Sequence, residues 1–191
     1  MSGEKLKVRH LEISDHELII DYFLNSDQEF LKRMGVDTLK LPSKQEWLDL
    51  LNSNFDLSDD KKKFFYMIWA LDDQPVGHSN INKIIYSNEA YMHLHLWKKQ
   101  TRQKGLGVEF LRLTIPYYFE IFHLENLFCE PSAYNPAPNK SLEKAGFDFI
   151  KSYDTVPGWI NFYQTVNLWC LSKKKFTNLY EKPKAGTTTR T

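Results

Sequence analysis

The sequence has few of the residues that mark disulfide-rich, metal-binding or membrane proteins. Its 191 residues include two cysteines, Cys129 and Cys170, with no Cys-x-x-Cys pair and no cluster of metal ligands. We therefore expect two buried free thiols and no metal site. The longest apolar run, residues 64–71, is far shorter than the about 20 residues that cross a bilayer, so we expect no membrane segment.

A strong charge of one sign is also absent. Lys and Arg number 25 against 24 Asp and Glu, a net charge of +1, whereas a dedicated nucleic-acid binder is usually strongly basic. Residues 173–191 carry a net +5, which leaves −4 on residues 1–172. A mildly acidic body favours a cationic small substrate over an anionic one. Residues 1–5 contain no apolar signal core, so we predict a cytoplasmic protein that binds no nucleic acid.

The composition is that of a globular protein, with 42% hydrophobic and 15% aromatic residues. A chain of this length forms one ordinary domain. We predict a domain over residues 1–172, followed by a basic, partly disordered tail over residues 173–191. The high aromatic content is compatible with a homodimer.

The spacing of apolar residues predicts an alternation of strands and helices. Alternating apolar and polar residues over 6–13 indicate a first strand. Ser14 or Asp15 is expected to cap a first helix, with Glu17 at the spacing of a capping box behind Ser14. Ser43 with Glu46 has the same spacing and opens a second helix. Later strands are expected at 64–71, 76–86, 91–97, 127–129, 147–153 and 161–171, and later helices from Leu106 and over 138–145. This order predicts the α/β class: one mixed sheet with helices on both faces.

The segment 96–110 is the most informative stretch. A strand runs into a loop with Gly105 and Gly107, and a long helix follows directly. Glycines let the backbone approach a ligand, and the first amides of the helix favour an anion such as a pyrophosphate. A nucleotide P-loop would need Lys and then Ser or Thr after Gly107, and a dinucleotide fingerprint would need glycine where Phe110 stands. A loop that merely starts a helix is the structural alternative.

Two motifs in the chain resemble those of the GNAT N-acetyltransferases. Residues 102–107 (Arg-Gln-Lys-Gly-Leu-Gly) match the family signature Arg/Gln-x-x-Gly-x-Gly/Ala, and residues 135–137 with 142–147 resemble the second family motif. The resemblance covers residues 5–171 and is nearest to the RimJ/RimL-like branch. It implies the GNAT acyl-CoA N-acyltransferase fold, whose mostly antiparallel sheet splays at a central parallel strand pair.

The resemblance also implies acetyl-CoA as the donor and an amine as the acceptor, either a small molecule or a protein N-terminus. The amine would attack the thioester directly. A backbone N–H near Trp97 or Lys98 would polarise the thioester carbonyl. The residues that the resemblance assigns to the cofactor are Leu96, Trp97, Lys98, Arg102, Gln103, Lys104, Gly105, Leu106, Gly107, Val108 and Asn135.

The proton-transfer groups depart from the family pattern. The usual thiol-protonating tyrosine falls at Leu142, and the serine of the RimL-like branch falls at Pro138; neither residue can donate a proton. We predict instead that His93, on the strand before the loop, and Glu130, at the end of the next strand, act as a catalytic pair. The unperturbed pKa of histidine, near 6.5, suits proton transfer at neutral pH. A sheet histidine and a strand-end carboxylate without catalytic roles are the alternatives.

One other activity and two binding roles remain as alternatives. The surroundings of His93 and Glu130 also resemble the siderophore hydroxylamine acyltransferases, in which a strand histidine and a carboxylate are catalytic. The residues at 138 and 142 favour a non-catalytic acyl-CoA-binding module. A general interaction domain, with its aromatic loops on a protein partner, is the third alternative.

Overall fold

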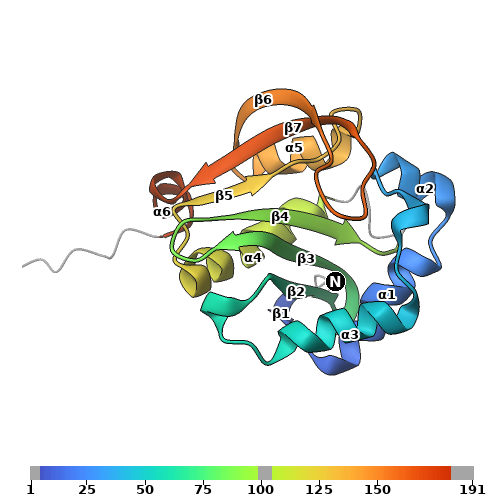
Figure 1. Ribbon diagram of the computed structural model, residues 1–191. Coiled ribbons are helices and arrows are strands. Elements are labelled where there is room, and N and C mark those ends of the chain that lie inside the picture. The colour runs from blue at the N-terminus through green and yellow to red at the C-terminus, as the bar shows by residue number, and fades with distance from the viewer. Residues whose placement is uncertain (1–4, 99–104, 182–191) are drawn as a thin grey trace, which may run out of the picture.

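The fold is built around a single seven-stranded sheet with the strand order β1-β2-β3-β4-β5-β7-β6 (Figure 1). The computed structural model describes residues 5–98 and 105–181. The strands are β1 (Leu6–His10), β2 (Phe64–Leu71), β3 (Gln74–Ile85), β4 (Glu89–Leu96), β5 (Asn126–Cys129), β6 (Asp148–Thr155) and β7 (Gln164–Ser172). The helices are α1 (His16–Leu24), α2 (Gln28–Arg33), α3 (Lys44–Phe55), α4 (Leu106–Phe122), α5 (Pro136–Lys144) and α6 (Lys173–Tyr180).

Every pair of neighbouring strands is antiparallel except β4 and β5, which are parallel. Parallel neighbours need a crossover connection, and α4 supplies it between these two strands. The predicted mixed sheet with one central parallel pair is confirmed.

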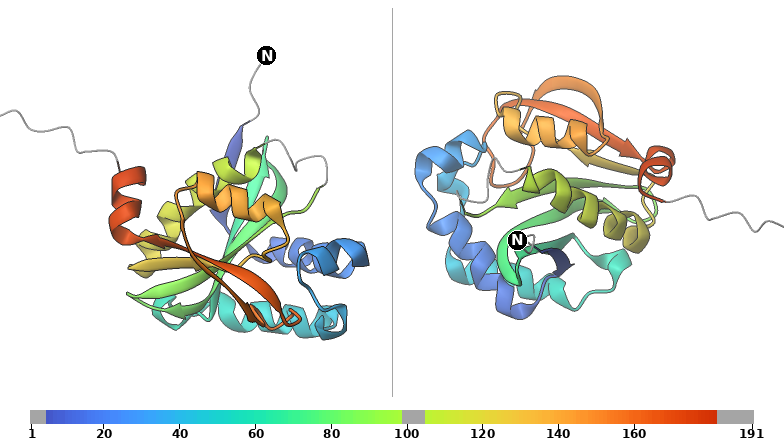
Figure 2. Two further views of the ribbon diagram at one scale, coloured as in Figure 1. Left: turned by 90° about the horizontal axis from the view of Figure 1, so that it is seen from above. Right: turned by 180° about the vertical axis from the view of Figure 1, so that it is seen from behind.

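Helices cover both faces of the sheet, as the sequence predicts (Figure 2). One core lies between the sheet and α4, where Trp69 of β2 stacks on Phe110 with ring centroids 5.0 Å apart. The other lies between the sheet and α1–α3, around Ile20, Trp47 and Ile68. None of the helices in the described ranges is both long and apolar enough to span a membrane.

One of the two predicted capping boxes is confirmed and the other is wrong. Ser43 and Glu46 cap α3 reciprocally. Ser14 and Glu17 form no box at α1: Asp15, the other predicted cap, is the N-cap residue of α1, and a box of Glu12 and Asp15 caps the 3-10 turn that precedes the helix. The physical reason is tertiary: the Asp15 carboxylate accepts from Arg9 Nη2 of β1 at 2.8 Å and from the Glu12 N–H at 2.9 Å.

The first part of the predicted basic tail is a helix. Ser172 caps α6, and Phe176 is buried with its ring stacked on Phe119 at 4.3 Å between centroids. This part therefore packs on the domain. Residues 182–191 lie outside the described residues, and the division at residue 172 stays a prediction.

Candidate active site

The parallel strands β4 and β5 separate in the middle of the sheet. Their pairing ends at Met92 opposite Cys129, so His93 and Glu130 are the first residues beyond the last pair. From there β4 stays paired with β3 as far as Leu96, while the chain after β5 follows β7 through a bridge between Ser132 and Val166. The predicted splay is confirmed, and the two predicted catalytic residues flank its start.

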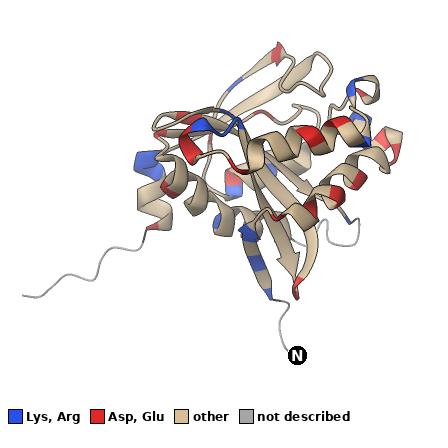
Figure 3. Cartoon of the chain, turned by 60° about the horizontal axis from the view of Figure 1, so that its bottom comes forward, with Lys and Arg blue, Asp and Glu red and all other residues tan. Residues whose placement is uncertain are grey.

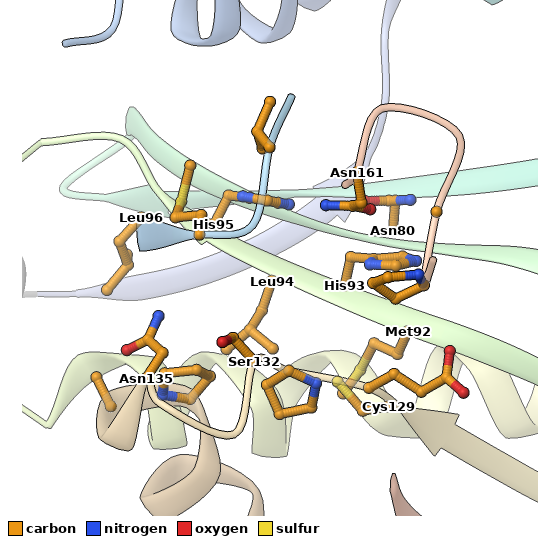
Figure 4. Close-up of a pocket in the computed structure, with 18 of the residues that line it drawn as sticks. Asn80, Met92, His93, Leu94, His95, Leu96, Cys129, Ser132, Asn135 and Asn161 are labelled. Atoms are coloured by element: carbon orange, nitrogen blue, oxygen red, sulfur yellow. The ribbon is translucent and has the colours of Figure 1, made fainter. Parts of the chain in front are cut away.

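A cavity of about 740 Å³ opens at this fork. Its walls come from both sides of β4: His93 and His95 project to one side, and Met92 and Leu94 project to the other (Figure 4). Side chains that follow one another along a strand alternate in this way. The predicted site residues that line the cavity are His93, Glu130, Leu96, Gly105, Gly107 and Asn135.

The start of α4 forms one wall of the cavity. Gly105 is the N-cap residue of α4 with φ of +77°, a left-handed conformation that favours glycine. A Cβ on Gly105 would meet nothing within 4 Å, whereas a Cβ on Gly107 would lie 3.8 Å from Ser141 Oγ. The first turn of a helix presents amides without an intrahelical acceptor, and these amides can bind an anion. The Val108 N–H, however, donates to Gly105 O at 3.1 Å.

Several predicted cofactor residues fall elsewhere. Arg102, Gln103 and Lys104 lie outside the described residues. The expected role of the Trp97 amide is wrong, because its N–H donates to Val76 O at 2.9 Å within the sheet. The Trp97 indole donates to His78 Nδ1 at 2.7 Å and packs in the core of α1–α3.

Lys98, Leu106 and Val108 are likewise not among the described walls of the cavity. Lys98 is exposed, while Leu106 and Val108 are buried. Leu106 and Val108 can thus serve a ligand at the start of the helix through their backbone and not through their side chains.

His93 is half-buried and bonds to an amide on the neighbouring strand. Its Nε2 lies 3.3 Å from Asn82 Oδ1. Burial, with a smaller contribution from Lys83, lowers the pKa of His93 from 6.5 to about 4. The expectation of an ordinary histidine pKa is therefore wrong. With the Asn82 oxygen as acceptor, the neutral ring carries its proton on Nε2 and keeps a lone pair on Nδ1.

Glu130 has different partners. Its side chain is only 4% exposed, Lys83 Nζ lies 3.5 Å from its carboxylate, and the Tyr153 hydroxyl donates to it. Burial, together with this hydrogen bond, raises the pKa of Tyr153, so the phenol stays a donor. The structure thus brings His93 and Glu130 to one cavity, but the hydrogen bonds and ion pairs of the described residues do not join the two side chains directly.

Sequence reasoning missed three polar residues at the site, namely Asn82, Ser141 and Tyr153, whereas Asn80 could already be expected to face the acceptor. Asn80, Asn82 and Ser141 line the cavity, whereas Tyr153 contributes by donating a hydrogen bond to the Glu130 carboxylate. The alternating asparagines of β3 gave a signal, because Asn80 pairs with His93 in the sheet register. Tyr153 comes from a distant hairpin, so no local pattern pointed to it.

The residues at the two positions where the family has its proton donors have different surroundings. Leu142 is fully buried in the core, and Pro138 lines the cavity. The hydroxyl group on α5 is that of Ser141, which donates to Ala137 O at 3.0 Å. Among the residues with assigned positions, no group of three His, Cys, Asp or Glu side chains is arranged to hold a metal ion.

Both cysteines are free thiols with raised pKa values. Cys129 is buried and Cys170 half-buried. Burial raises the pKa of both, that of Cys170 to about 11. Cys129 nevertheless contributes to the cavity wall, although the sequence gave no reason to place it near the loop.

The family follows from a comparison of the sequence with known protein families. Residues 5–148 match the family described as acetyltransferase (GNAT) domain. The chain belongs to the GNAT acetyltransferase family. None of the curated proteins is significantly similar to this GNAT chain in sequence.

Solved structures of GNAT acetyltransferases share the fold at low sequence identity. A spermidine N-acetyltransferase from Vibrio cholerae, in complex with CoA and spermine, is 17% identical with a TM-score of 0.74, covering 91% of this chain and 98% of its own. RimL, a ribosomal-protein acetyltransferase in complex with coenzyme A, is 15% identical with a TM-score of 0.71, covering 90% and 96%. An aminoglycoside acetyltransferase in complex with coenzyme A is 13% identical with a TM-score of 0.71, covering 92% and 99%.

Proposed function

We propose that this GNAT chain is an acetyl-CoA-dependent N-acetyltransferase in which a primary amine attacks the thioester directly. The observation that carries the proposal is the fork between β4 and β5, which joins the start of α4 to a cavity with His93 and Glu130 at its centre. Family membership supports the reaction class, and the structures with the same fold include complexes with CoA and with amines.

The walls fit the donor in two respects. Gly105 has open space where a side chain would stand, beside the first amides of α4, as a bound pyrophosphate requires. Beyond Met92 the described pairing of β4 with β5 stops, so an extended pantetheine arm can lie along β4 beside Leu94 and Leu96, with Asn135 across from it. Acetyl-CoA supplies the activated acetyl group; the chain supplies its position.

The side chains at the fork handle the proton of the amine. Glu130 offers a negative charge at which an ammonium group can be held. The neutral His93 has a lone pair on Nδ1 that can accept the proton lost by the amine, directly or through water. As the new C–N bond forms, the C–S bond breaks and the thiolate leaves. Because Leu142 and Pro138 have no acidic proton, the thiolate takes its proton from water.

Acetyl-CoA binding is tested first. Isothermal titration should show binding by the parent and a large loss with Gly105→Val, because a β-branched side chain at positive φ is strained and occupies the open space beside α4. Leu113→Val is the control, since it introduces the same β-branched residue into α4 at an exposed position outside the cavity wall. Equal affinity of Gly105→Val and the parent, with both folded by circular dichroism, would place the cofactor elsewhere.

Catalysis is tested separately by the release of free thiol from acetyl-CoA with a panel of amines and one hydroxylamine. The buried Leu142 and the proline at 138 favour a second candidate, a non-catalytic acyl-CoA-binding module. Tight acetyl-CoA binding without thiol release by any acceptor would establish that module. Turnover with the hydroxylamine alone would instead establish a hydroxylamine acyltransferase.

A further inference from the structure

The acceptor end of the cavity is aromatic and almost uncharged. Phe23 and Trp47 stack there with ring centroids 5.1 Å apart, and Trp159 meets Trp47 edge to face at 6.0 Å. Trp159 lies in the loop between β6 and β7 and is 54% exposed. These rings form an apolar wall of the cavity on the side of α1–α3, with only Trp159 exposed.

Polar groups at this end are amides rather than carboxylates. Asn80 and Asn161 lie on the same side of β4 as His93 (Figure 4), and Gln164 is also part of the wall. The Asn161 and Gln164 amides both donate to Gly35 O, at 2.8 and 3.1 Å. The amides thus hold the loop to the segment after α2 and add no charge to the cavity.

Glu130 is the one carboxylate among the described residues of the cavity wall. It already has Lys83 at 3.5 Å and the Tyr153 hydroxyl as partners. The remaining charged side chains of the wall, Lys140 and Lys144, are cationic and lie on α5. The outer surface, in contrast, carries many residues of both signs (Figure 3). Apart from Glu130, the described wall thus offers a cationic ligand no carboxylate.

We infer that the acceptor is a primary amine with a single positive charge, carried on a flat aromatic or apolar body, rather than a polyamine or another polycation. This inference rests on the proposed function and names its substrate class. One ammonium group can sit at Glu130, and the rings can stack on the body. Each further ammonium group would lose its hydration, and no second carboxylate among the described wall residues would compensate for the lost free energy. Cation–π contacts with the rings compensate for only part of it.

The test compares four amines in the thiol-release assay: tryptamine and phenethylamine against spermine and kanamycin. We expect kcat/KM to be at least about tenfold higher for the aromatic amines, the ratio that one unreplaced charged hydrogen bond produces. Trp159→Ala should raise KM for tryptamine several-fold and leave the affinity for acetyl-CoA unchanged. Asn80→Asp adds a carboxylate opposite His93 and should reduce the ratio of kcat/KM for tryptamine to kcat/KM for spermine.

The outcomes separate this inference from the proposed function. Faster turnover of spermine or kanamycin than of both aromatic amines would overturn the inference and leave the N-acetyltransferase intact. An unchanged KM for tryptamine in Trp159→Ala would also count against it, and this variant changes an exposed side chain, so it does not depend on the folding of Asn80→Asp. No turnover of any amine, with acetyl-CoA bound, would overturn the proposed function and this inference with it.

Discussion

His93 and Glu130 should be coupled in catalysis but independent in stability. Their hydrogen-bond partners differ: His93 bonds to Asn82, whereas Glu130 is held by Lys83 and Tyr153. Lys83 acts on His93 only through its charge, which has little effect on the neutral imidazole. Without a direct bond, the effects of His93→Ala and Glu130→Gln on the free energy of unfolding should add to within about 0.5 kcal/mol. If both side chains handle the same amine proton, their effects on turnover should not add.

The magnitudes follow from general acid–base catalysis, which contributes about 10²–10⁴-fold. His93→Ala should therefore lower kcat at least about 100-fold, equivalent to about 2.7 kcal/mol of transition-state stabilisation. Glu130→Gln should lower kcat/KM for the amine to a smaller extent, because the amide keeps the shape and the Tyr153 hydrogen bond. In the double variant the combined loss should fall short of the product of the single losses by at least about tenfold.

Steady-state thiol release and urea unfolding are measured on four proteins: the parent, His93→Ala, Glu130→Gln and the double variant. Losses in kcat/KM that multiply fully in the double variant would refute the idea that both side chains handle the same proton. Normal turnover of both single variants would mean that the enzyme acts only by positioning the substrates. His95→Ala is the control, two residues along the same face of β4. An inactive His95→Ala with a normal His93→Ala would mean that the catalytic residue was assigned to the wrong position on the strand.

Three further outcomes are expected. The double variant Cys129→Ala, Cys170→Ala should keep its turnover, because raised pKa values hold both thiols protonated; complete loss with an intact fold would favour a covalent intermediate. Thr114→Val should lower the free energy of unfolding by about 1–3 kcal/mol in urea melts, since it leaves the buried Trp69 indole N–H, now 2.8 Å from Thr114 Oγ1, without a partner, and should not change acetyl-CoA affinity. Because the pKa of His93 falls from 6.5 to about 4 on folding, the unfolded chain binds more protons at this residue between those pH values. The stability lost through His93 should be absent above about pH 6.5 and reach up to about 3 kcal/mol toward pH 4. His93→Gln should reduce the slope of stability against pH without abolishing it, since burial also lowers the pKa of His16 and His78.

Local patterns predicted most of the fold because they are local in origin. The capping box at Ser43 and the strand over residues 64–71 follow from side chains a few positions apart, and both were predicted correctly. At α1 the sequence left Ser14 and Asp15 as alternative caps, and Asp15, which Arg9 of β1 binds, is the N-cap residue. The Ser14–Glu17 spacing is the same as the Ser43–Glu46 spacing, but the contact between Arg9 and Asp15 decides the structure at α1.

The site shows the same division. The sequence by itself determined the glycine-containing start of α4, the strand with alternating histidines, and the family to which the chain belongs, because each depends on spacing along one segment. Only the tertiary structure decided that Glu130 bonds to Tyr153 and Lys83 rather than to His93, that burial lowers the pKa of His93, and that Glu130 is the single carboxylate among the described residues of the cavity wall. Those properties depend on which distant side chains share one desolvated space, and spacing along the chain does not specify it.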